Sequence, residues 1–404
     1  MDNVKVYYGN WSAMPQPRKI KILKMITFAL YSFFLLFLVI YAFGGTGKKT
    51  SVKKKAVVFM EVMPHNLEAL RYLAQRRDVV ISMIVLTVNG WNINLASANE
   101  NVHNFLAQLK NEGFTTTIPV YYGNSVSMVN DDFVTNIAFT ANETYSVSAC
   151  TYRKYVRYAL RAQADLLFGA SPTLDRVLSS DGSSFTYFES ALSSLLSSSS
   201  VDFLILGPCT NAAYFLQKYA TLRSRVTGIY AAGGAFNVKG NTLNVYVGNT
   251  KAEINFFLDP LAANYITQGS HGIPLTLFPL DGIMTWNTTA YATIVTNRLS
   301  SSSVNTASVV ANAINGYNSK TGSSTNRIRL EVIAAAYWAD TSVQNGATVT
   351  SIPVSVTNGN SMTSDGTSYR PSSSTYNFDV TVVMAVVEST FFSRLLGVDS
   401  LSLA

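Results

Sequence analysis

The chain has 404 residues, of which 48% are hydrophobic and only 13% are charged, a length and composition that can bury a large core. Ten of its thirty basic residues lie in the first 55 positions. The remainder is close to neutral, which excludes a nucleic-acid-binding surface of the usual basic kind. The low charge content is typical of a secreted, lumenal or complex-embedded protein, and the length favours one main domain.

The N-terminal segment predicts a membrane anchor. After a tail of residues 1–24, Met25–Phe43 contains no charged residue. As a helix this run extends about 30 Å, the thickness of a bilayer's hydrocarbon core. It is long for a signal peptide and no small-residue cleavage site follows, so we expect a retained single-pass transmembrane helix. Five basic residues precede the run and five follow it, which leaves the topology across the membrane open.

A basic linker, residues 44–55, leads into a domain of residues 56–404. In this domain, apolar β-rich runs alternate with helical segments, which implies right-handed crossovers and a parallel sheet. We expect strands at Ala56–Met60, Val79–Val88, Ile118–Tyr122, Val201–Gly207, Val226–Ala232 and Ile273–Pro279. The helices expected between and after them are Leu67–Arg76, Leu95–Asn111, Phe188–Leu196, Asn211–Tyr219 and Pro260–Thr267.

Two stretches are less regular. Residues 124–200 form a divergent insertion region with a helix expected at Tyr152–Ala164, and this region is a candidate lid. Beyond Trp286, we expect helices at Ala307–Tyr317 and Leu330–Trp338 and strands at Thr348–Val356 and Tyr376–Val387.

The cysteines and glycosylation sequons leave the compartment open. Cys150 and Cys209 are the only cysteines, so there is no disulfide framework. A single bridge is one alternative, but the apolar setting of Cys209 favours a buried thiol. Asn142 and Asn287 fit glycosylation sequons, although chance alone produces about this many in such a chain.

Five segments, in chain order, resemble the nucleoside hydrolases, the inosine-uridine preferring ribohydrolases. VVFMEVMPHNLEALRYL resembles the family's opening D-x-D-P-G-x-D-D and helix. LGPCTNAA at 206–213, GGAFNVKGN at 233–241, AEINFFLDPLAA at 252–263 and IPLTLFPLD at 273–281 resemble four later landmarks. The resemblance covers about three quarters of the chain. It implies an α/β fold with an open, mostly parallel sheet flanked by helices, preceded here by one transmembrane helix.

The same resemblance implies a calcium site that has been dismantled. The places of the four first-loop aspartates hold Phe59, Glu61, His65 and Asn66, and the family's later H-D-P becomes Leu330, Glu331 and Val332. Asn94 (or Asn92) and Thr210 remain as vestigial neutral ligands. Calcium requires six to eight oxygen ligands, several of them anionic. We therefore expect no calcium and no other cofactor, and no catalytic residue at these positions.

Three further residues keep the family's ribose-binding types. Asn241, Glu253 and Asn255 match positions that hydrogen-bond the ribose hydroxyls, so they would bind a ligand if the pocket survives. The alternative is that they satisfy buried backbone groups. If the domain is a scaffold, side chains such as Phe59, Met60 and Met63 should fill the old pocket.

The sequence therefore predicts an inactive nucleoside hydrolase-like domain that serves as a membrane-anchored accessory or structural subunit of a larger membrane complex. We expect the membrane and other protein subunits as partners, and no nucleic acid; a homodimer is left open. The favoured location is the inner mitochondrial membrane, in a respiratory assembly, with the cell surface or endomembranes as alternatives. Two other functions are a membrane-anchored nucleoside- or ribose-binding protein and a residual N-ribohydrolase with Glu61 as base.

Overall fold

The computed structural model describes residues 15–44, 53–87, 95–114, 117–123, 187–242, 248–298, 305–321, 327–359, 363–372 and 378–396. The chain divides into two compact units, Met1–Val52 and Lys53–Ala404. Each is described by itself.

The first unit contains one long helix, α2, at Gln16–Gly44. The helix includes the whole predicted segment Met25–Phe43, whose side chains are described as far as Phe34. Within the described residues, no helix is both long enough and apolar enough to cross a membrane. The helix is therefore as expected, while its role as an anchor stays a prediction.

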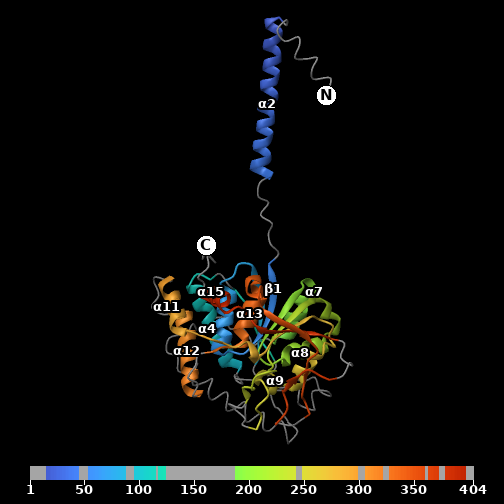
Figure 1. Ribbon diagram of the computed structural model, residues 1–404, viewed down its shortest axis with the longest axis vertical. Helices are drawn as coiled ribbons and strands as arrows, with labels where there is room; N and C mark the ends of the chain where they lie inside the picture. The colour runs from blue at the N-terminus through green and yellow to red at the C-terminus, as the bar shows by residue number, and fades with distance from the viewer. Residues whose placement is uncertain are drawn as a thin grey trace. The chain divides into compact units, whose positions relative to one another are not determined.

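The second unit is built on an eight-stranded sheet with the order β3-β2-β1-β4-β5-β6-β12-β9 (Figure 1). Its strands are β1 Lys54–Met60, β2 Val79–Leu86, β3 Val120–Tyr122, β4 Val201–Leu206, β5 Val226–Ala232, β6 Leu275–Phe278, β9 Thr348–Ile352 and β12 Val380–Ala385. Neighbouring strands are parallel, except that β9 runs antiparallel to β12. The open, mostly parallel sheet agrees with the sequence prediction.

Two short hairpin-like pairs lie outside the main sheet. β10 (Ser355–Val356) pairs with β11 (Ser368–Tyr369), and β7 (Met284–Thr285) pairs with β8 (Arg327–Ile328). The single strand predicted at Thr348–Val356 is wrong, because it breaks into β9 and β10. Pro353 lies at the break, where its missing N–H cannot join a strand ladder.

Helices cover both faces of the sheet (Figure 1). They are α3 Pro64–Ala74, α4 Leu95–Asn111, α7 Phe188–Ser198, α8 Thr210–Lys218, α9 Ile254–Leu258, α10 Pro260–Gln268, α11 Thr288–Arg298, α12 Thr306–Thr321, α13 Leu330–Ala339, α14 Thr341–Gln344 and α15 Glu388–Leu395, with 3-10 turns η1 Ala220–Arg225 and η3 Leu280–Gly282. The helix expected at Tyr152–Ala164 lies outside the described residues. The end of the divergent region forms α7, whose apolar side chains pack in the core.

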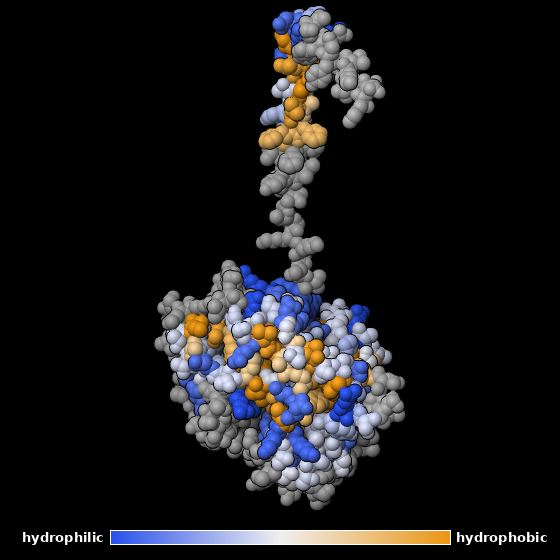
Figure 2. Space-filling model, in the orientation of Figure 1, coloured by the Kyte–Doolittle hydropathy of each residue, from blue (hydrophilic) through white to orange (hydrophobic). Residues whose placement is uncertain are grey.

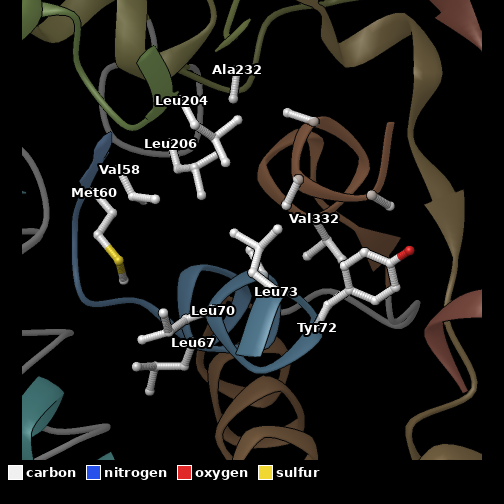
Figure 3. Close-up of a cluster of buried hydrophobic side chains, with 14 of the residues drawn as sticks. Val58, Met60, Leu67, Leu70, Tyr72, Leu73, Leu204, Leu206, Ala232 and Val332 are labelled. Atoms are coloured by element: carbon white, nitrogen blue, oxygen red, sulfur yellow. The ribbon is translucent and has the colours of Figure 1, made fainter. Parts of the chain in front are cut away.

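The core has one layer on each face of the sheet, because successive strand residues point to opposite faces. Figure 3 shows one layer, in which Val58 and Met60 of β1 and Leu206 of β4 point toward α3, represented by Leu67 and Leu70. The other layer contains the alternate strand residues and the apolar side chains of α7, α8 and α10. Strands buried on both faces explain the nearly continuous apolar runs in the sequence.

Candidate functional site

The carboxyl ends of β1, β4 and β5 meet at one edge of the sheet, the usual place for ligands in open α/β folds. The segments that leave these strands are 61–66, 207–210 and 233–242, and α13 also begins there. The side-chain amide of Asn66 donates to the carbonyl of Leu206 at 2.6 Å, which joins the first loop to the end of β4. The topology thus brings the sequence-predicted residues to a common edge.

Phe59 belongs to the core. Its side chain is fully buried, and its ring packs edge-on against Phe203, with centroids 4.9 Å apart, and against Phe188. It therefore lies on the opposite face of the sheet from Met60 and Met63, which pack against α3. The expectation that these three side chains fill one pocket together is wrong, because neighbouring residues of a strand alternate between faces.

His65 and Asn66 lie in the first turn of α3, after Pro64 at the start of the helix. Both side chains are buried. Burial, together with the nearby Arg329 guanidinium, holds the pKa of His65 well below its usual value, so the imidazole is neutral. Neither ring nitrogen has a hydrogen-bond partner in the described part of the chain.

Glu61 is also buried and follows β1 directly. Its side chain lies against Gly207, where a Cβ atom would stand 3.1 Å from the Glu61 Cγ atom. A glycine after β4 thus makes room for this carboxylate.

A second group of polar side chains gathers after β5, around Glu253, Asn255 and Glu331. The Asn255 Nδ2 atom lies 3.4 Å from the Glu331 Oε1 atom and 3.5 Å from the carbonyl of Ala232. Burial raises the pKa of Glu253 to about 8, with a further contribution from Glu331, whose own pKa burial also raises. Among the described residues, Glu253 Oε1 and Glu331 Oε2 are buried without a hydrogen-bond partner.

Most of the remaining polar atoms of this group are used by the local backbone. Glu253 Oε2 accepts from the Phe256 N–H at 3.2 Å and caps α9, while Asn241 Oδ1 accepts from the Ile254 N–H at 2.7 Å. These contacts agree with the alternative in which the ribose-type residues satisfy backbone groups. Leu330, at a position where the sequence resemblance implies a histidine, is buried in the core.

Thr210, the vestigial ligand candidate at the start of α8, is buried and bonded to an aspartate. Its hydroxyl donates to Asp259 Oδ2 at 2.5 Å, and Asp259 Oδ1 accepts from the Ala262 N–H at 3.1 Å, capping α10. Sequence reasoning did not single out Asp259, although an aspartate before Pro260 is the pattern of a helix cap followed by proline at the first helical position. Burial raises the pKa of the adjacent Cys209, a buried thiol as expected.

The remaining metal candidates are not assembled in the described part of the chain. Asn92 and Asn94 lie outside the described residues. Within those residues, no group of three or more His, Cys, Asp or Glu side chains is arranged to hold a metal ion.

Comparisons with known proteins agree with the overall fold. The family model described as inosine-uridine preferring nucleoside hydrolase matches residues 67–393. No curated protein matches the chain. Similar solved structures include a plant nucleoside hydrolase, with 18% identity, a TM-score of 0.60 and coverage of 85% of this chain and 99% of that one.

Two bacterial structures are similar to the same extent. A purine-preferring ribonucleoside hydrolase from Gardnerella vaginalis has 16% identity and a TM-score of 0.59, covering 85% of this chain and 97% of that one. An inosine-uridine preferring nucleoside hydrolase from Bacillus anthracis has 16% identity and a TM-score of 0.56, with the same two coverages. At these identities the likenesses show a shared fold.

Proposed function

Because the chain belongs to the inosine-uridine preferring nucleoside hydrolase family, we propose that it is a catalytically inactive member that serves as a membrane-anchored subunit of a larger membrane assembly. The observation that carries this proposal is the state of the positions that align with the family's first-loop aspartates, at the end of β1 and the start of α3. Phe59 is packed in the core, and the amide of Asn66 donates to Leu206. Neither side chain offers the anionic oxygens that a calcium ion needs.

Among the other residues at the aligned metal positions, only Glu61 and Glu331 have carboxyl groups, fewer anionic oxygens than calcium usually requires. His65 presents neutral nitrogens, which do not suit a hard cation that prefers oxygen ligands. Glu331 lies beside Asn255 and Glu253, and burial raises its pKa. This donor set does not fit calcium, and we derive no catalytic step through that ion.

The membrane part of the proposal rests on the N-terminal helix. Met25–Phe43 carries no charge, and large apolar side chains of α2, such as Phe28 and Phe33, are each 74% exposed. Apolar surface of this kind costs about 25 cal/mol per Å² in water, which favours its burial in lipid or against other subunits. The inner mitochondrial membrane is our favoured location, with the cell surface and endomembranes as alternatives.

The test is detergent solubilisation of the native membrane, blue-native separation and mass spectrometry of the proteins that co-migrate with the chain. Co-migration in fixed stoichiometry with a large complex is the expected result. In parallel, the purified full chain should release no base from inosine or uridine in calcium buffer. Migration alone, together with measurable base release, would overturn the proposal.

A second candidate function has one specific observation in its favour. Glu253 Oε1, Glu331 Oε2 and the ring nitrogens of His65 are buried polar atoms without partners in the described residues, and such atoms normally contact water or a ligand. A polar ligand such as a nucleoside would satisfy them. A residual hydrolase is a separate alternative, in which Glu61 would act as the base; Glu61→Gln should then abolish any base release, and an unchanged rate would remove the idea.

A further inference from the structure

The opposite edge of the sheet, where the parallel strands begin, carries a cluster of exposed basic side chains. Lys53 and Lys55 lie at the start of β1, Arg77 precedes β2, and Arg225 precedes β5. All four side chains are exposed, and we call them the amino-edge cluster. Figure 2 shows hydrophilic residues, in blue, gathered on the domain near the start of β1.

Strand register places this cluster on one side of the domain. Lys55 of β1 pairs with Val80, and the next residue, Ala56, pairs with Asp202 of β4. Val201 of β4 pairs in turn with Val226 of β5. Adjacent strands lie about 4.8 Å apart, so the starts of β2, β1, β4 and β5 span about 15 Å.

Three acidic groups beside the cluster, Asp78, Asp202 and Asp340, are already engaged, whereas the exposed Asp379 lies farther along this edge, before β12. Arg76 forms two ion pairs: its Nη2 atom lies 2.6 Å from Asp78 Oδ2, and its Nη1 atom lies 2.5 Å from Asp340 Oδ2. Asp202 accepts from the Thr227 hydroxyl and from the Trp338 indole N–H. In contrast, the four side chains of the amino-edge cluster make no ion pair or hydrogen bond within the described part of the chain.

The sequence leading to this edge has the same sign of charge. Lys48 and Lys49 precede the cluster in the linker, and β1, the first strand, begins here at Lys54. Any membrane-held segment N-terminal to β1 is therefore joined to the domain at its amino edge. Exposed basic groups beside a membrane attachment are attracted to anionic lipids by about 1 kcal/mol for each Lys or Arg.

We propose that the amino-edge cluster docks the domain onto an anionic bilayer surface, with lipid phosphate and carboxylate headgroups as its ligands. This inference rests on the proposed membrane anchoring. The seven residues of β1 extend about 23 Å, and the candidate functional site lies at their far end. A domain docked by its amino edge presents that site to the aqueous side, where subunits or small polar ligands can reach it.

The test uses the full chain in nanodiscs of phosphatidylcholine, with or without about one third phosphatidylserine. Hydrogen exchange is followed at the backbone amides of residues 54–56 and 224–227. We expect these amides to exchange about tenfold more slowly in the anionic discs, and the difference to disappear at about 0.5 M salt, where charges are screened. Equal exchange in the two kinds of disc would overturn the docking.

Two charge-matched variants locate the effect. The first removes the cluster by Lys53→Gln, Lys55→Gln, Arg77→Gln and Arg225→Gln, and it should lose the lipid-dependent protection. The control removes two exposed lysines and two exposed arginines that lie outside the amino-edge cluster, by Lys239→Gln, Lys251→Gln, Arg327→Gln and Arg370→Gln. The control should keep the protection, and its loss in both variants would contradict a site-specific docking.

Failure of the anchor is distinguishable from failure of the docking. A chain that cannot enter nanodiscs and is extracted from membranes by carbonate contradicts the anchor. Docking is then measured by co-sedimentation of the full chain with vesicles of phosphatidylcholine, with or without phosphatidylserine. Sedimentation that depends on phosphatidylserine and on the amino-edge cluster supports the docking, and sedimentation independent of both overturns it.

Discussion

At the residue scale, Glu253 shows how burial changes the chemistry of an acid at the candidate site. Its pKa rises from an ordinary 4.5 to about 8, first because the carboxyl is desolvated and also because Glu331 lies near it. Between these two pH values, the folded state therefore keeps a proton on Glu253 that the unfolded state has lost. Stability contributed by this proton is present in full below about pH 4.5 and is lost as the pH rises through about 8.

Replacing Glu253 with glutamine should flatten this pH dependence. Between about pH 5 and 7.5, the variant should lose a slope of about 1.4 kcal/mol per pH unit in the free energy of unfolding. The slope from Glu68, whose pKa burial also raises to about 8, should remain. Denaturant unfolding at several pH values measures the slope, with the exposed Glu388→Gln as control; an unchanged slope in Glu253→Gln would contradict the protonated state.

Sequence patterns could identify the altered positions but not their new roles. Comparing the first loop with the family motif was enough to predict that Phe59 and His65 cannot replace aspartates as calcium ligands. The pattern could not place Phe59 against Phe203, nor predict that Asn66 donates to Leu206. Those contacts join segments more than a hundred residues apart, which local spacing does not encode.

At the element scale, a buried polar cluster fixes α3 to its neighbours. The Arg71 Nε atom donates to the Thr306 hydroxyl at 2.8 Å, and its Nη2 atom lies 3.5 Å from Glu112 Oε2. Tyr291 donates to Glu68 at 2.7 Å. Because the raised pKa keeps Glu68 neutral, Arg71 and Glu112 form a single balanced ion pair between α3 and the end of α4.

Arg71→Met should destabilise the domain by about 3–5 kcal/mol, because it leaves the Glu112 charge buried without its partner. Glu68→Gln, which resembles the neutral acid in shape, should cost far less. The double variant Arg71→Met with Glu112→Leu should regain part of the loss, since it removes both charges but leaves the Thr306 N–H without its Glu112 acceptor. Chemical denaturation of the three variants measures these differences, and equal losses in Arg71→Met and Glu68→Gln would contradict the neutral state of Glu68.

Elements with a strong local pattern were the predictable ones. The bounds of α4 agree with the predicted Leu95–Asn111, because its apolar residues recur at helical spacing. α11 was not predicted, since Thr288–Arg298 is rich in β-branched residues that favour strands. α15 was also missed, at Glu388–Leu395, where a short helix directly follows a strand.

At the scale of the whole molecule, alternation of strands and helices predicts the parallel half of the sheet but not its far edge. β12 returns from the end of the chain to lie parallel to β6, and β9 then pairs with it in the opposite direction. Such pairings depend on long-range packing rather than on local periodicity. The segments with family motifs nevertheless follow β1, β4 and β5, whose order in the sheet brings these segments to one edge.

The response of the whole chain to calcium distinguishes a lost metal site from a weakened one. A ligand that binds only the folded state stabilises it by RT ln(1 + [L]/Kd), about 2.7 kcal/mol at a hundredfold excess over Kd. For a domain of this size, such a gain raises Tm by several degrees.

Because Phe59, His65 and Asn66 supply no anionic oxygen, we expect 1 mM calcium to shift Tm by less than about 1 °C. This concentration is about a hundredfold excess for a Kd near 10 µM. Thermal unfolding of the full chain in detergent measures this shift, with magnesium at equal ionic strength as control. A Tm that rises with calcium concentration and not with magnesium would show that the remaining carboxylates, Glu61 and Glu331, still hold the ion, and the proposed inactivity would then lose its physical basis.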